Sequence, residues 1–224
     1  MKEKLREVIE KDNDGNIIER KFYLGNNLEG EYTSYYGNGQ VMVRLFFENG
    51  LKNGDAISFF RDGNIREKGI FVDDKLVGEY LSYHENGRIR EQENYKAGKL
   101  DSLRRCYFNN GQLKEEEFFS RGTFQGDYTV FYKSGQLREK GNYKNDKHDD
   151  EYISYHRNSV VKEKAFYKNG KLVGVFQRFD EQGKEISGTV GFNDDYESED
   201  DMSEKQNRID ALMKDFQVFK QNEQ

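Results

Sequence analysis

Proline is absent from the 224-residue chain. Strands in the middle of a sheet exclude proline because it has no N–H group to donate to the neighbouring strand, so its absence is compatible with extensive β-structure. Cys106 is the only cysteine, which excludes a disulfide framework and fits a reducing compartment. We therefore expect a cytoplasmic protein.

Long apolar runs are missing as well. No stretch approaches the roughly 18 apolar residues of a membrane span, and residues 1–15 lack the apolar segment of a secretory signal. Hydrophobic residues make up 34% of the chain and charged residues 35%, which is too polar for a thick two-layer core. Aromatic residues reach 14%, which argues against disorder. A thin sheet stabilised by aromatic side chains reconciles these values.

The charge of the chain is unevenly distributed. Residues 191–224 contain ten acidic and four basic residues, so this tail accounts for the whole formal net charge of −6. The first 190 residues carry 32 charges of each sign. Because nucleic-acid binding requires a basic surface, we expect no nucleic-acid partner.

The sequence is built on a repeat of 24 residues. One glycine column marks a turn in each unit, with Ser159 filling a single gap: Gly15, Gly39, Gly63, Gly87, Gly111, Gly135 and Gly183. A second column starts the units, with Ser102 and Asp150 as exceptions: Gly30, Gly54, Gly78, Gly126 and Gly174. Units therefore begin near residues 6, 30, 54, 78, 102, 126, 150 and 174.

Side chains follow the same period. One aromatic column consists of Tyr35, Phe59, Tyr83, Tyr107, Phe131, Tyr155 and Phe179, and a second of Tyr23, Phe47, Phe71, Tyr95, Phe119, Tyr143 and Tyr167. An aliphatic column contains Ile17, Val41, Ile65, Ile89, Leu113, Leu137 and Val161. A basic column (Arg66, Arg90, Lys114, Arg138, Lys162) directly precedes a glutamate column (Glu67, Glu91, Glu115, Glu139, Glu163). Cross-strand pairs within such columns contribute about 0.2–1 kcal/mol each.

Each unit predicts one β-hairpin. Asn86-Gly87 joins two alternating runs, and this dipeptide is a strong hairpin signal because both residues accept the positive φ of a tight turn. A second turn at Ala97-Gly98 leads to the next unit. The chain therefore predicts an all-β fold: an elongated, twisted antiparallel β-meander of tandem 24-residue hairpin repeats over residues 1–187, plus a C-terminal amphipathic α-helix.

At each end of the array, the sequence is compatible with two interpretations. Arg6–Asp12 fits the first strand of a degenerate unit, but Leu5, Val8 and Ile9 also fit a short helix. Residues 188–202 predict an acidic linker, and residues 203–221 predict the helix, with an apolar stripe of Ile209, Leu212, Met213, Phe216 and Phe219. This helix could cover an open sheet edge or dock on another chain.

The units GEYLSYHENGRIREQENYKAGKL and GDYTVFYKSGQLREKGNYKNDK resemble the MORN-repeat variant of bacterial proteins in the YwqK antitoxin-like family. The resemblance covers about residues 12–187. It implies an elongated β-meander that acts as an interaction module, and it implies a toxin as the partner to be neutralised. Some eukaryotic MORN proteins bind acidic phospholipids or dimerise. Four residues depart from the pattern and mark a kink or a contact patch: Ser102, Arg104, Asp150 and Ser159.

Candidate chemistry is sparse. His84 and His156 lie three units apart, about 29 Å by strand spacing, which is too far to share a metal ion. Arg104 and Arg105 could lower the pKa of Cys106, although a small strand residue is the favoured interpretation. The glutamate column could supply paired carboxylates, but solvated charge ladders are favoured. We expect no catalytic, cofactor-binding or metal-binding residues and no cofactor.

A protein partner is the favoured function. Tyrosine and arginine are common in interfaces, and six of them gather in the middle of the array as a candidate partner-binding patch: Tyr80, Tyr83, Arg104, Arg105, Tyr107 and Tyr128. The acidic tail would steer a basic partner electrostatically. Binding to phospholipid is the alternative, disfavoured by the neutral array, and self-association stays open.

Overall fold

The computed structural model describes residues 4–190, and residues 1–3 and 191–224 lie outside the described part. The described residues form one antiparallel sheet of 22 strands and contain no helix. The predicted all-β meander is thereby confirmed. Within this part of the chain, no helix is long and apolar enough to cross a membrane.

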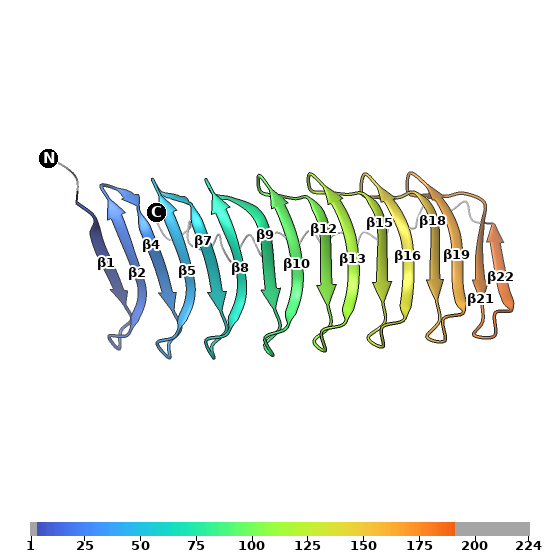
Figure 1. Cartoon of the computed structure of the whole chain (residues 1–224), viewed down its shortest axis with the longest axis horizontal. Helices are drawn as coiled ribbons and strands as arrows, with labels where there is room; N and C mark the ends of the chain where they lie inside the picture. The colour runs from blue at the N-terminus through green and yellow to red at the C-terminus, as the bar shows by residue number, and fades with distance from the viewer. Residues whose placement is uncertain (1–3, 191–224) are drawn as a thin grey trace. The chain divides into compact units, whose positions relative to one another are not determined.

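The sheet is a row of eight hairpins in sequence order (Figure 1). The hairpins are β1 (Arg6–Lys11) with β2 (Ile17–Leu24), β4 (Gly30–Tyr35) with β5 (Val41–Glu48), β7 (Gly54–Phe59) with β8 (Ile65–Val72), β9 (Lys75–Tyr83) with β10 (Ile89–Lys96), β12 (Ser102–Tyr107) with β13 (Leu113–Ser120), β15 (Gly126–Phe131) with β16 (Leu137–Lys144), β18 (Asp150–Tyr155) with β19 (Val161–Lys168), and β21 (Val175–Phe179) with β22 (Glu185–Val190). Two-residue strands connect them: β3 (Asn27–Leu28), β6 (Leu51–Lys52), β11 (Lys99–Leu100), β14 (Thr123–Phe124), β17 (Lys147–His148) and β20 (Lys171–Leu172).

The first and last strands define where the hairpin array begins and ends within the described residues. The strand interpretation of Arg6–Lys11 is confirmed, because these residues pair with β2 from Arg6–Tyr23 to Lys11–Ile17. At the other end, β22 continues to Val190, past residue 187, where the sequence places the end of the array. The rest of the predicted linker and the predicted helix lie outside the described residues.

The hairpin turns differ from the predicted tight turn. In the turn after β9, the N–H of Gly87 donates to the carbonyl of His84 (2.8 Å), and the N–H of His84 donates to that of Arg88 (2.8 Å). Of the residues in this turn, only Gly87 has a positive φ (79°). The prediction that Asn86 shares this conformation is wrong: a three-residue loop with a single left-handed glycine replaces the two-residue turn. Instead, Asn86 Oδ1 accepts a hydrogen bond from the Arg88 N–H (3.2 Å).

The turns at the opposite ends of the strands are the two-residue ones. Asn49 (φ 53°) and Gly50 (φ 82°) are both left-handed, and the flanking residues Glu48 and Leu51 pair directly. The predicted turn Ala97-Gly98 has the same geometry (51° and 78°). Positive φ at both central residues matches the right-handed twist of the flanking strands.

A third left-handed position explains the second glycine column. Gly30, Gly78 and Gly126 have φ values of 86°, 69° and 78°. Gly30 and Gly126 begin the first strand of their hairpins, and Gly78 lies at the equivalent position within β9. Ser102 (90°) and Asp150 (89°) occupy the same conformation without being glycine. An L-residue with a side chain is strained there.

We expect Ser102→Gly to raise the free energy of unfolding by about 1 kcal/mol, because it removes this backbone strain. The reciprocal change, Gly78→Ser, should lower it by a similar amount. A Cβ atom at Gly78 would meet nothing within 4 Å. The two substitutions therefore measure the cost of the positive φ alone, without a steric clash. Urea denaturation measures both changes, and an unchanged midpoint for Gly78→Ser would contradict this assignment.

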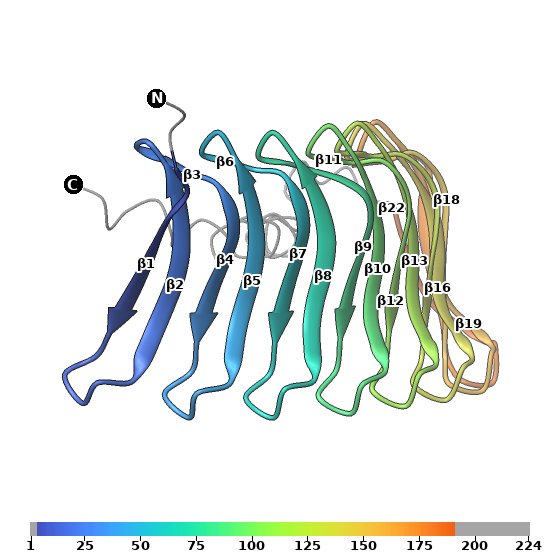
Figure 2. The same ribbon diagram turned by 60° about the vertical axis from the view of Figure 1, so that its left-hand side comes forward.

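The strands of the sheet are bowed (Figure 2). The buried side chains gather on one of the two faces of the sheet. We call it the glutamate face; it carries Tyr80, Ser82, Glu91 and Glu93 and their equivalents in other units. We call the other the stripe face. Apart from Thr33, Leu81, Ile153 and the connecting residue Asp149, all the buried residues lie on the glutamate face. The core of the sheet is therefore one-sided.

Aromatic rings run along the glutamate face. Phe124 stacks between Phe119 (5.0 Å between centroids) and Tyr143 (4.1 Å). The stack continues through His148, which lies 4.2 Å from Tyr143 and 5.2 Å from Tyr167. Ring contacts between neighbouring units thus connect the hairpins, as expected from the second aromatic column.

Candidate interaction surfaces

The six residues of the predicted patch do not form one surface. Three of them are buried on the glutamate face, with exposed fractions of 2%, 8% and 6%: Tyr80, Arg104 and Tyr128. The other three lie half-buried on the stripe face: Tyr83, Arg105 and Tyr107. Successive side chains of a strand point to opposite faces, so the odd spacing between Tyr80 and Tyr83 already separates them. Partner binding by these residues stays a prediction.

Arg104 is the centre of a buried ion cluster. Its Nη1 lies 2.7 Å from Glu117 Oε2, its Nε 2.8 Å from Glu93 Oε1, and its Nη2 3.6 Å from Glu91 Oε1. The three glutamates are at most 2% exposed. The interpretation of the glutamates as solvated charge ladders is therefore wrong at Glu91, and also at Glu67, which is 3% exposed.

The cluster replaces an aromatic contact found in other units. Tyr80 and Tyr128 lie over glycines, because a Cβ atom added at Gly69 would come 3.2 Å from the Tyr80 ring and one at Gly141 would come 2.8 Å from the Tyr128 ring. At Arg104, both neighbouring positions of this row are glutamates instead. A ring packed against glycine has thus been exchanged for a guanidinium packed between carboxylates.

The electrostatics of the cluster follow from burial. Burial raises the pKa of Glu93 above its ordinary value, and Arg104 only partly opposes this shift. Burial also raises the pKa of Cys106 to about 12, although Arg104 acts to lower it. The idea that the arginines activate this thiol is therefore wrong: Cys106 is protonated at neutral pH and 5% exposed.

The stripe face carries a continuous apolar band beside the hairpin turns. We call it the stripe; it consists of six directly paired couples of one aromatic and one aliphatic residue: Tyr35–Val41, Phe59–Ile65, Tyr83–Ile89, Tyr107–Leu113, Phe131–Leu137 and Tyr155–Val161. Most of these residues are half-buried, and Ile65 is 38% exposed. In the last hairpin Phe179 pairs with Glu185, where the stripe ends.

Two charged rows run parallel to the stripe on the same face. The basic row lies two residues along each strand from the stripe and contains six cations and one carboxylate: Arg20, Arg44, Lys68, Arg105, Glu116, Lys140 and Lys164. The acidic row lies two residues further and contains six carboxylates and no cation: Glu7, Glu31, Asp55, Glu79, Asp127 and Glu151. The face is thus banded, although the array is neutral overall.

Five segments of the sequence, one hairpin each, match the MORN repeat variant: residues 28–49, 76–97, 100–120, 124–145 and 151–169. The chain contains five MORN repeats of this variant. No curated protein matches the sequence. MORN repeats point to a repeat protein involved in binding or scaffolding.

The MORN geometry extends beyond the matched segments. Hairpin β7–β8 lies between the first two matches, yet Ser58 pairs with Glu67 as Ser82 pairs with Glu91 in the matched hairpin β9–β10. Both hairpins also have a register shift directly after this pair. The structure therefore shows repeats that the sequence match misses.

His84 and His156 link neighbouring hairpins through hydrogen bonds to the backbone. The ring nitrogen Nε2 of His84 donates to the Tyr107 carbonyl (2.9 Å), and that of His156 donates to the Phe179 carbonyl (2.8 Å). Tyr36 makes the same bond to the Phe59 carbonyl through its hydroxyl group (2.7 Å). Each ring thus ties one turn to the next. In residues 4–190, no three His, Cys, Asp or Glu residues are placed to hold a metal ion.

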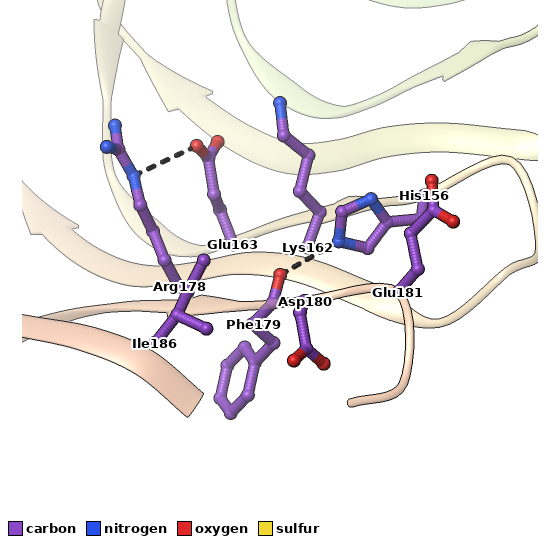
Figure 3. Close-up of a pocket in the computed structure, with 8 residues that line it drawn as sticks. All are labelled: His156, Lys162, Glu163, Arg178, Phe179, Asp180, Glu181 and Ile186. Carbon is purple, nitrogen blue, oxygen red and sulfur yellow. Dashed lines mark hydrogen bonds and ion pairs between the residues drawn. The ribbon is translucent and has the colours of Figure 1, made fainter. Parts of the chain in front are cut away.

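A shallow hollow of about 490 Å³ lies at the last two hairpins (Figure 3). Lys162, Glu163 and Arg178 extend to the same side of it, and Arg178 Nε lies 3.3 Å from Glu163 Oε1. His156 is held by its bond to Phe179, and Ile186, which is 62% exposed, forms part of the wall. Its charged groups are engaged with each other or face solvent, which does not favour the hollow as a small-molecule site.

Proposed function

We propose that this MORN-repeat protein is a non-catalytic protein-interaction module that binds its partner through the stripe. The observation that carries the proposal is the uninterrupted band of half-buried aromatic and aliphatic side chains over six hairpins. Contiguous exposed apolar surface on a soluble protein marks an interaction site. Aromatic anchors such as Tyr83 and Tyr107 supply large contact areas at such sites.

The absence of catalysis is part of the proposal. General acid–base chemistry needs titratable groups that converge on a substrate. The most perturbed carboxylate, Glu93, is instead buried against Arg104, and the rings of His84 and His156 are engaged with backbone carbonyls. The finer form of the proposal, neutralisation of a toxin, rests on the resemblance of the units to the YwqK antitoxin-like family.

The proposal is tested by affinity purification of the full chain from its source cells. We expect the variant Tyr83→Ala/Tyr107→Ala to lose at least about 90% of the partner retained by the wild type, because interface anchors typically contribute more than 1–2 kcal/mol each. Partner retention is quantified by mass spectrometry, with circular dichroism as a check on folding.

The matched control is Phe118→Ala/Phe166→Ala. These two rings are 41% and 45% exposed on the same face, but they lie in the acidic row and outside the stripe. The control should retain the partner. Equal retention by the stripe variant and the wild type would overturn the proposal.

A further inference from the structure

The charges next to the stripe identify the chemistry of the segment that binds there. Four cations of the basic row are paired within the sheet: Arg20 with Glu7 (2.5 Å), Arg44 with Glu31 (4.0 Å), Arg105 with Glu116 (2.6 Å) and Lys164 with Glu151 (3.1 Å). Lys68 and Lys140 are exposed and have no carboxylate partner among residues 4–190. The row therefore offers two free ammonium groups and four partly shared cations to an incoming anion.

The spacing of the stripe and the two charged rows favours a narrow binding element over a flat surface. Two residues along a strand correspond to about 6.8 Å, so the basic row is one such step from the stripe and the acidic row is two. An α-helix, about 10 Å in diameter, covers the stripe and the basic row and leaves the acidic row uncovered. A flat anionic membrane would meet all three bands, including the six carboxylates of the acidic row.

The period of the sheet also fits a helix. Successive units lie about 9.6 Å apart, because each contributes two strands. A heptad rises about 10.5 Å, and a helix tilted by roughly 24° to the sheet axis matches the two periods. Each unit then receives one apolar position of the helix against a pair such as Tyr83–Ile89 and one flanking position beside a cation.

We propose that the stripe and the basic row together bind an amphipathic α-helix of the partner that carries acidic residues along one flank and lies across the strands. This inference rests on the proposed function and specifies the bound element. The helix contacts Tyr83, Tyr107 and their equivalents through its apolar positions, and its acidic flank faces Lys68 and Lys140. The proposal concerns the charge of the bound helix and makes no statement about the net charge of the whole partner.

Synthetic peptides test the inference with the full chain. The probe is a fluorescent peptide of four heptads with leucine at the apolar positions and glutamate on one flank, and its twin carries lysine on that flank. We expect the acidic peptide to bind at least tenfold more tightly than its twin, with an affinity that falls as salt rises. Fluorescence anisotropy measures both.

Charge reversal locates the site. The variant Lys68→Glu/Lys140→Glu should weaken binding of the acidic peptide at least tenfold. The control Lys99→Glu/Lys147→Glu makes the same change in net charge at exposed lysines next to the two-residue turns, at the opposite ends of the strands, and should bind as the wild type does.

Three results would overturn the inference: equal binding of the two peptides, equal loss in the control variant, or binding of vesicles with anionic lipid that Lys68→Glu/Lys140→Glu abolishes while neither peptide binds. The test is separable from that of the proposed function. If Tyr83→Ala/Tyr107→Ala loses the cellular partner but neither peptide binds, the stripe is the interface and the bound element is not an acidic helix. If both fail, the stripe itself is excluded.

Discussion

Replacement of Arg104 by alanine is expected to lower the free energy of unfolding by about 3–5 kcal/mol, because it leaves the buried carboxylates of Glu91, Glu93 and Glu117 without their shared guanidinium. Urea denaturation followed by circular dichroism measures the loss. Since each repeat contacts only its neighbours, the damage should be greatest in hairpins β9–β10 and β12–β13, where hydrogen exchange can locate it.

The adjacent arginine provides the control. Arg105 forms one ion pair, with Glu116 (2.6 Å), on the half-exposed stripe face, and such pairs contribute about 0–1 kcal/mol. Arg105→Ala should therefore be nearly neutral. Equal losses for the two variants would contradict the assignment of the cluster. The triple variant Arg104→Tyr/Glu93→Gly/Glu117→Gly places a ring against glycine, as at Tyr80 and Tyr128, and removes two of the three buried carboxylates. It should recover part of the stability, because Glu91 still loses the guanidinium.

Gly87→Val is expected to destabilise the protein by about 1–3 kcal/mol, because a β-branched residue is forced to a φ near 79°. A Cβ atom at this position would meet nothing within 4 Å, so the loss comes from the backbone and not from a clash. The shift of the thermal or urea midpoint measures the effect.

Gly37→Val is the matched control for this turn position. Gly37 lies in the equivalent turn of an earlier unit, its φ is not positive, and its surroundings are equally open. We expect little change there. The reverse experiment is Ser159→Gly, which should stabilise the chain because Ser159 occupies the left-handed position with a φ of 66°. If Gly37→Val and Gly87→Val behave alike, the turn assignment is incorrect.

The fold could be predicted because the 24-residue period repeats every local signal. Glycine columns predicted two turns per unit, and the structure has a left-handed residue at each, including Gly87 and Gly98. The type of turn was harder to predict, because Asn-Gly is compatible with more than one loop length. At Asn86 the side chain bridges the turn, and the backbone is not left-handed.

The candidate surface was only partly predictable. Tyr83, Arg105 and Tyr107 lie on the stripe face, and the spacing by even numbers of residues within each strand would have grouped them. Residue type favoured Tyr80, Arg104 and Tyr128 equally, but these side chains are buried on the other face. Whether a face is covered depends on the packing of rings and ions between units, which no single unit specifies.

The buried ion cluster left a signal in the sequence. Two of the four tyrosines in this row have glycine or alanine opposite them, Gly141 opposite Tyr128 and Ala165 opposite Tyr152. Leu45 lies opposite Tyr32 and Glu93 lies opposite Tyr80. The unit with Arg104 has Glu117 opposite it. Arg104 thus lies between Glu93 and Glu117 in this row. An arginine between two glutamates indicates charge compensation, whereas charge content alone suggested exposure to solvent.

The central claim, that the stripe is the binding surface, is tested most directly by hydroxyl-radical footprinting of the full chain with and without the partner recovered by affinity purification. Binding should protect Tyr83, Tyr107 and Phe131 together and leave Phe118 and Phe166 labelled. Protection confined to the glutamate face, for example at Tyr23 and Tyr167, or to the hollow around Arg178, with the stripe labelled as in the free protein, would contradict it.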